Sequence, residues 1–96
     1  MRGAWEVIVE PRTKRTYIAV EKYRQTICVS DVLNPQCQTG KYDDIMVATQ
    51  AMWDHMGDDS DYAVFYFENE QCYRCAWPKV LDNGMVQYDR RIEDIY

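Results

Sequence analysis

The chain has 96 residues, which is enough for one domain with a single modest core. Its hydrophobic content of 47% and aromatic content of 14% exclude a disordered chain, and its formal charge of −5 argues against a molecule that binds phosphate over its whole surface. No apolar run approaches the roughly 18 residues of a membrane span, and the N-terminal stretch MRGAWEVIVE holds no signal peptide, so we expect a cytoplasmic protein with reduced cysteines.

Three strands are predicted in the first third of the chain: AWEVIVE (4–10), TYIAVEKY (16–23) and QTICVS (25–30). Alternation in the first of them places Trp5, Val7 and Val9 on one face. The other two are rich in β-branched and aromatic residues, with a helix over 20–29 as an alternative. With the basic turn PRTKR (11–15), these segments predict an antiparallel meander.

A loop is predicted over 31–40, where Asn-Pro begins a turn and Gly40 breaks regular structure. An amphipathic helix, YDDIMVATQAMWDHMG (42–57), follows it. One arc of this helix is predicted to face the sheet and holds Ile45, Met46, Ala48, Thr49, Met52, Trp53 and Met56. We therefore expect Trp53 to be buried between the helix and the sheet.

The second half of the chain predicts three further strands: YAVFYFE (62–68), QCYRCAW (71–77) and, after a DNG hairpin turn (82–84), MVQYD (85–89). Pro78 ends the second of these or places it at an edge, and RRIEDIY (90–96) is predicted as a short helix or a tail. The whole chain therefore predicts an α+β fold, in which one amphipathic helix packs on an antiparallel sheet in the order β-β-β-α-β-β-β. One helix cannot cover six strands, so part of the sheet stays solvated, curls strongly or is used by a partner.

Cysteine offers the most specific candidate chemistry. Cys72 and Cys75 form a C-x-x-C motif, and Cys28 and Cys37 can complete a four-thiolate zinc site. In a strand, however, residues i and i+3 point to opposite faces, and CYRC lacks the small residues of a zinc knuckle. A thioredoxin-like site would need the motif at a helix N-terminus. Ordinary reduced thiols are favoured, with a zinc site or a disulfide as alternatives.

Catalytic signatures are weaker still. His55, the only histidine, lies beside Asp54, and carboxylates with an imidazole can bind a divalent cation. The following DDSD lacks the spacing of an EF-hand loop, so an exposed histidine is favoured. The chain has no G-x-G-x-x-G, P-loop or H-E-x-x-H motif and no nucleophile with a supporting histidine. The sequence therefore predicts a protein that is not an enzyme and that holds no cofactor or metal.

Charge suggests a partner of a different kind. The basic stretch 11–15 lies near tyrosines, as in single-strand binders, but nearby glutamates dilute it, and a charged edge that prevents aggregation is favoured. The stretch DHMGDDSDY (54–62) crowds carboxylates at the C-terminal end of the predicted helix, where the helix dipole favours positive charge. Carboxylates interspersed with tyrosines can attract and hold a basic surface, with a merely solvated surface as the alternative. The predicted partner-binding residues are Asp54, Asp58, Asp59, Asp61, Tyr62, Glu68, Glu70 and Tyr73.

In overall character this small, acidic, tyrosine-rich chain resembles inhibitor proteins encoded by phages and mobile elements, including anti-CRISPR and other anti-defence proteins. The resemblance implies a monomer or homodimer that docks on a basic, nucleic-acid-binding site of a host defence complex, in some cases by imitating phosphate charge. It implies no direct contact with nucleic acid or membrane, and it assigns no functional residue. The alternatives are a cysteine-based zinc module and a regulatory subunit that dimerises through an uncovered sheet face.

Overall fold

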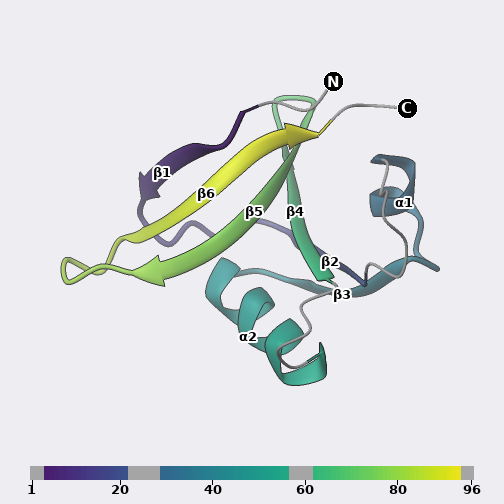
Figure 1. The fold of residues 1–96 in the computed structure, drawn as a ribbon, viewed down its shortest axis with the longest axis horizontal. Helices are drawn as coiled ribbons and strands as arrows, with labels where there is room; N and C mark the ends of the chain where they lie inside the picture. Colours follow the sequence, from purple (N-terminus) through teal and green to yellow (C-terminus); the bar gives the residue numbers. More distant parts are fainter. Residues whose placement is uncertain (1–3, 22–28, 57–61, 94–96) are drawn as a thin grey trace.

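The computed structural model describes residues 4–21, 29–56 and 62–93. In chain order its elements are β1 (Glu6–Glu10), β2 (Tyr17–Glu21), α1 (Val29–Leu33), β3 (Gln38–Tyr42), α2 (Ile45–Met56), β4 (Tyr62–Glu68), β5 (Gln71–Val80) and β6 (Val86–Glu93). The strands form one antiparallel sheet in the order β1-β6-β5-β4-β2-β3 (Figure 1). The predicted α+β class is confirmed, with α2 between the third and fourth strands of the chain.

The N-terminal third does not form the predicted meander. β1 pairs with β6, the last strand, whereas β2 pairs with β3 and β4. The strand predicted over 25–30 is wrong from Val29, where α1 begins, and Cys28 lies outside the described residues. The loop predicted over 31–40 instead contains part of α1 and the start of β3. A helical turn forms here because it buries Val29 and Val32, three residues apart, on one side.

Helix α2 has a narrower buried stripe than its sequence predicts. Ile45, Ala48 and Met52 are buried, at the i, i+3 and i+7 spacing of a helix that lies on a sheet. Trp53 follows Met52 by one residue and therefore projects about 100° further round the helix axis. Its side chain is 49% exposed, so the prediction that Trp53 lies between helix and sheet is wrong.

The C-terminal strands are longer than predicted. Pro78 does not end β5, because a shift in register between Ala76 and Lys79 accommodates it and pairing with β6 continues to Val80. The predicted DNG turn is present, with a φ of 85° at Gly84. β6 runs to Glu93, so a helix or tail beginning at residue 90 is wrong over 90–93. The last three residues of that prediction, 94–96, lie outside the described part of the chain.

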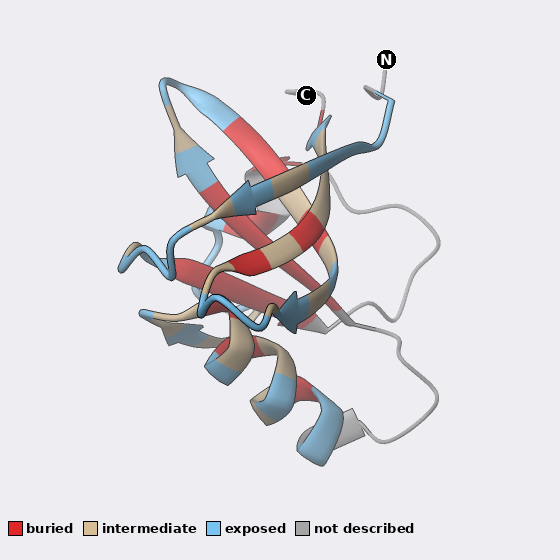
Figure 2. Cartoon of the chain, turned by 90° about the vertical axis from the view of Figure 1, so that its left-hand side faces the viewer, coloured by how far each residue is buried: buried red, intermediate tan, exposed pale blue. Residues whose placement is uncertain are grey.

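Each face of the sheet carries its own core. The first, here called the helix face, packs against α2 and has the core Tyr17, Ile45, Ala48, Val64, Tyr66, Tyr73, Cys75, Val86 and Tyr88. The opposite, open face has the core Ile18, Val20, Val29, Val32, Ala63, Phe65 and Cys72. Helix α1 covers the end of the open face that holds Ile18, Ala63 and Cys72, and Figure 1 places it far from β1. Figure 2 shows β1 exposed along most of its length. Apart from its end at Cys72 and Glu93, the β5–β6–β1 part of the open face is covered by no helix among the described residues.

Among the described residues, no helix has both the length and the apolar character that crossing a membrane requires.

Candidate functional site

Among the residues predicted to bind a partner, those that the structure describes do not gather on one surface. Tyr62 begins β4 and Glu68 ends it, so the two ends of this seven-residue strand lie about 20 Å apart. Asp54 lies at the far end of α2 from its N-terminus, exposed, and accepts a hydrogen bond from Gln50 (2.9 Å). The other carboxylates of that stretch, Asp58, Asp59 and Asp61, lie outside the described residues.

Three predicted residues around the β4–β5 turn also differ in environment. Glu68 forms an ion pair with Arg15 (3.2 Å), and Glu70 is exposed in the turn itself. Tyr73 is only 9% exposed and stacks on the ring of Tyr66, with 5.2 Å between ring centroids. Tyr73 is therefore part of the helix-face core and not of an acidic surface.

The buried tyrosines form a polar network with arginine and glutamate. The guanidinium of Arg90 donates to the hydroxyl of Tyr66 (2.8 Å), which lies 2.9 Å from that of Tyr88. Tyr88 in turn donates to Oε1 of Glu10 (2.9 Å), so Tyr66 must be the donor to Tyr88. Arg15 lies 4.4 Å above the Tyr66 ring and bonds Glu10 (3.2 Å). Burial raises the pKa of the Tyr66 and Tyr88 hydroxyls, which keeps both neutral.

Arginines of the basic stretch 11–15, which the sequence offers as a candidate nucleic-acid interface, form ion pairs within the protein. Arg15 binds Glu10 and Glu68, and Arg12 binds Asp44 through two hydrogen bonds (2.9 and 3.1 Å). The basic stretch 11–15 therefore spends both of its arginines on contacts within the protein. This leaves little support for a nucleic-acid interface there.

The cysteines separate in the way that strand geometry predicts. Cys72 belongs to the open-face core and Cys75 to the helix-face core, so their thiols cannot meet at one metal ion. Cys37 packs near the open-face core, and burial raises the pKa of Cys72 to about 12. The described residues contain no group of three or more side chains able to hold a metal ion. Neither observation favours the zinc alternative.

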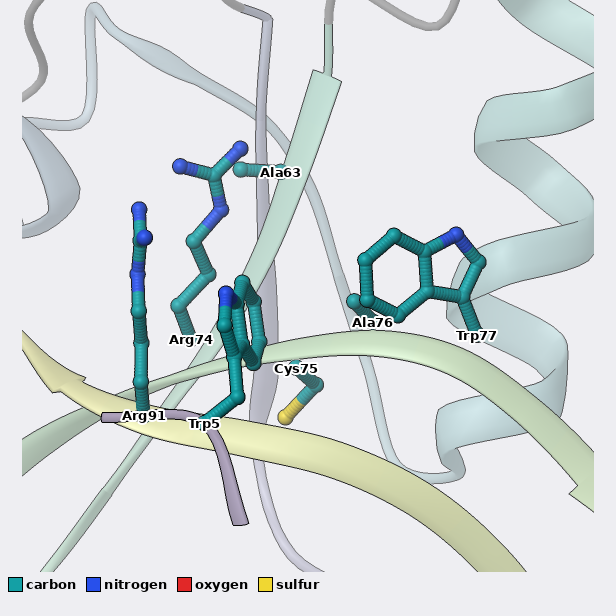
Figure 3. A pocket seen from close by; sticks show the side chains of 7 residues that line it. All are labelled: Trp5, Ala63, Arg74, Cys75, Ala76, Trp77 and Arg91. Atoms are coloured by element: carbon teal, nitrogen blue, oxygen red, sulfur yellow. The ribbon is translucent and has the colours of Figure 1, made fainter. Parts of the chain in front are cut away.

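A groove on the open face gathers side chains that the sequence does not mark as a site. It has a volume of about 360 Å³ and is lined by Trp5, Ala63, Arg74, Cys75, Ala76, Trp77 and Arg91 (Figure 3). Arg74 on β5 and Arg91 on β6 are directly opposite each other in the strand pairing. Figure 3 shows both side chains extending from the sheet in the same direction. We call this feature the Trp–Arg groove.

Two tryptophans from distant parts of the chain meet at this groove. Trp5 precedes β1 and Trp77 lies in the irregular part of β5, with 5.5 Å between their ring centroids. The guanidinium of Arg91 lies 4.7 Å from the Trp5 ring centroid, and its Nε donates to Glu93 (3.0 Å). These contacts fix both the indole of Trp5 and the direction of Arg91.

Trp77 is the most unusual residue of the groove. Its φ of 52° is left-handed, a conformation that bulky residues rarely adopt because Cβ approaches the carbonyl oxygen. Its side chain is nevertheless 72% exposed, so no burial of the indole offsets this strain. Strained backbone that carries an exposed aromatic side chain is typical of functional positions.

Comparison of the chain with protein-family models, with curated proteins and with solved structures found no match. A signal for the groove is nevertheless present in the sequence. Trp5 alternates with Val7 and Val9, and Trp77 precedes a proline inside a strand pattern. The pairing of β1 with β6, which brings the two indoles together, has no comparable sequence signal.

Proposed function

We propose that the protein is a small binding protein, not an enzyme, which docks on another protein through the uncovered part of its open face. The observation that carries this proposal is the exposed indole of Trp77, held in a left-handed conformation beside Trp5. Tryptophan and arginine dominate the residues that contribute most to protein–protein binding. The groove supplies both types at one place.

Apolar surface continues from the groove along β1. Val7 and Val9 are 64% and 48% exposed, and they pair opposite Asp89 and Gln87 on the open face. Together with Trp5 and Trp77 they form an apolar strip, and with the Trp–Arg groove this strip is the docking surface that we propose. A contiguous exposed apolar patch with a polar rim favours an interaction site over a solvated surface.

The functional class that we propose is the one that the resemblance implies, a cytoplasmic inhibitor encoded by a phage or mobile element that covers a site on a host defence protein. The buried polar groups support a binding role, because the arginines, tyrosines and glutamates of the helix face satisfy one another. Compared with the sequence-based prediction, this proposal moves the docking surface from the acidic residues to the Trp–Arg groove.

Affinity capture tests this proposal. The full chain is immobilised as wild type, as Trp5→Ala with Trp77→Ala, and as Trp53→Ala, and proteins captured from a bacterial lysate are quantified by mass spectrometry. Trp53 is a matched control because its indole is also half exposed but belongs to α2 on the other face. We expect a specific protein to be captured by wild type and Trp53→Ala and lost from the double variant.

The contrary outcome is equally clear. Capture that survives in the double variant but is lost in Asp54→Asn would return the docking role to the acidic residues. Light scattering on the purified chain tests the alternative that the same face joins two copies. A dimer that Trp5→Ala with Trp77→Ala dissociates would identify the partner as a second copy of this chain.

A further inference from the structure

We infer that the Trp–Arg groove receives a carboxylate of the partner protein, held between Arg74 and Arg91 with an apolar neighbour of that carboxylate against the two indoles. This inference rests on the proposed function, because it names the chemistry of the segment that occupies the docking surface.

The placement of the two arginines is the first argument. Directly opposite residues of antiparallel strands have Cβ atoms about 4.5–5.5 Å apart, and like charges there are destabilising. Arg74 and Arg91 occupy such a pair on the open face, and Glu93 offsets part of their positive charge through its 3.0 Å ion pair with Arg91. A planar guanidinium binds a carboxylate through two parallel hydrogen bonds, so two adjacent guanidiniums form a site for that group.

The second argument is that these side chains are held in position. Glu93 accepts a hydrogen bond from Nε of Arg91, and the indole of Trp5 supports the same guanidinium. The bond to Glu93 uses Nε alone, and a guanidinium carries further N–H donors on its two Nη atoms. Arg74 also interacts within the protein, so neither arginine depends on a ligand for order. A site whose side chains are already ordered loses less entropy when it binds.

The third argument distinguishes a single carboxylate from a polyanion. Asp89 lies on the same face opposite Ala76, and Glu93 lies beside the arginines, so a chain of phosphates would meet negative charge on either side. The net charge of −5 also repels nucleic acid at long range. A carboxylate flanked by apolar side chains meets the guanidiniums and then Trp5, Trp77 and Val7. The surroundings therefore favour an acidic-apolar peptide segment.

Small side chains make room for this ligand. Ala63 and Ala76 are the smallest side chains that line the groove. A larger residue at either position would fill the place that the carboxylate and its neighbour would take.

The experiment selects peptides from a phage-displayed random library on the immobilised full chain, and synthesises the enriched sequences. We expect these sequences to share an Asp or Glu next to an apolar or aromatic residue. Replacement of that acid by Asn or Gln should weaken binding about tenfold or more, because a charge-assisted hydrogen-bond pair is lost. Arg74→Gln and Arg91→Gln should each weaken binding similarly, and Lys41→Gln, an exposed lysine on β3, should not.

Arg91→Lys serves as a more conservative variant than Arg91→Gln. It keeps the positive charge but replaces the planar guanidinium, which can form two parallel hydrogen bonds, with an ammonium group. All variants are compared at equal thermal stability, and a fluorescein-labelled oligothymidine serves as the nucleic-acid probe. Peptides without an acid, binding unaffected by the arginine variants, or oligothymidine that competes for the groove would each overturn the carboxylate inference. If Trp5→Ala with Trp77→Ala abolishes peptide binding while the arginine variants do not, the proposed docking surface is supported. In that case only the inference that the arginines bind a carboxylate is contradicted. If the library yields no peptide whose binding depends on the two tryptophans or on the two arginines, both proposals are contradicted.

Discussion

On the helix face, Arg15 and Arg90 cover aromatic rings. Helix α2 packs over only part of the helix face, and beyond it the guanidiniums of Arg15 and Arg90 lie over Tyr66 and Tyr73 at 4.4 and 4.3 Å from the ring centroids. Stacking of this kind gains both cation–π attraction and apolar contact. The charges are balanced by glutamates on β1, including Glu6, which binds Arg90 at 2.7 Å. The edge strand β1 is thereby tied to the centre of the sheet.

Tyr88→Phe tests this network at its centre. The substitution leaves the Tyr66 hydroxyl without its acceptor and removes a donor from Glu10, both in a largely buried place. The free energy of unfolding should fall by about 1–3 kcal/mol, as measured by urea denaturation. Tyr17→Phe, an equally buried ring outside this chain of hydrogen bonds, is the control and should cost less. Equal effects of the two variants would mean that the chain of hydrogen bonds adds nothing to stability.

Asp44 begins α2 and gives a pH-dependent prediction. Its Oδ1 accepts the backbone N–H of Met46 (2.8 Å) and Val47 (3.3 Å), and Arg12 binds the same carboxylate. Asp44→Ala should cost about 0.5–2 kcal/mol through loss of the N-cap. Asp44→Asn keeps an oxygen that can cap the helix but loses the ion pair with Arg12, so its cost should be smaller.

The sign of the pH effect follows from the pKa. Hydrogen bonds from Arg12 hold the pKa of Asp44 below its ordinary value of 3.8. The carboxylate therefore contributes stability above that value, and this contribution is lost as the pH falls through the folded-state pKa. The stability difference between wild type and Asp44→Asn should shrink on acidification in thermal melts. A difference that grows in acid would contradict the ion pair.

At the scale of elements, the β4–β5 turn stores backbone strain. Asn69 and Glu70 have φ of 52° and 65°, and positive φ at both central residues is the pattern of a type I′ turn, which prefers Asn-Gly. Glu70→Gly should therefore raise the free energy of unfolding, by up to about 1 kcal/mol. Gln71→Gly, in the adjoining strand, is the control and should lower it. A loss of stability in Glu70→Gly would show that the glutamate side chain makes a contribution larger than the strain.

The elements differ in how far their sequences predict them. The stripe Ile45, Ala48 and Met52 marks α2 because a period of 3.6 residues is distinctive over three turns. β3 was missed because it is a polar edge strand whose Gly40 is read as a breaker. In the fold Gly40 lies against the ring of Tyr42, and a Cβ there would lie 2.6 Å from the Tyr42 hydroxyl unless that side chain moved.

The C-terminal half of β6 is another strand segment that the sequence does not predict, for a different physical reason. The sequence RRIEDIY has no apolar alternation, and a strand was therefore not predicted there. Arg90 faces the helix face, opposite Cys75, and does the work of an apolar residue by stacking on Tyr73. Binary patterning has no means of recognising a partly buried strand position that is occupied by arginine.

For the whole molecule, the candidate site is harder to predict from the sequence than the fold. Sequence spacing correctly places Trp5, Val7 and Val9 on one face, but their partner Trp77 joins them only through β1–β6 pairing and the register shift in β5. Tyr73 is predicted at the surface because it lies among carboxylates and other tyrosines in the sequence, and only the strand register shows that its face is covered. The charge pattern of the sequence also does not show which carboxylates are paired within the protein, as Glu68 is with Arg15.

Trp77→Gly separates docking from folding. Glycine relieves the left-handed strain of about 1–2 kcal/mol, and the substitution loses the contact with Trp5, which is worth about 0.5–1.5 kcal/mol. These effects oppose each other, so the free energy of unfolding should change by less than about 1 kcal/mol in urea denaturation. A much larger loss would mean that Trp77 is a structural residue.

Affinity capture with this folded variant bears most directly on the docking surface. We predict that Trp77→Gly, at wild-type stability, loses the protein that wild type and Trp53→Ala both capture from the lysate. Because 72% of the Trp77 side chain is exposed in the free protein, such a loss can be assigned to the missing contact with the partner. Capture of that protein by Trp77→Gly in the wild-type amount would contradict docking through the Trp–Arg groove.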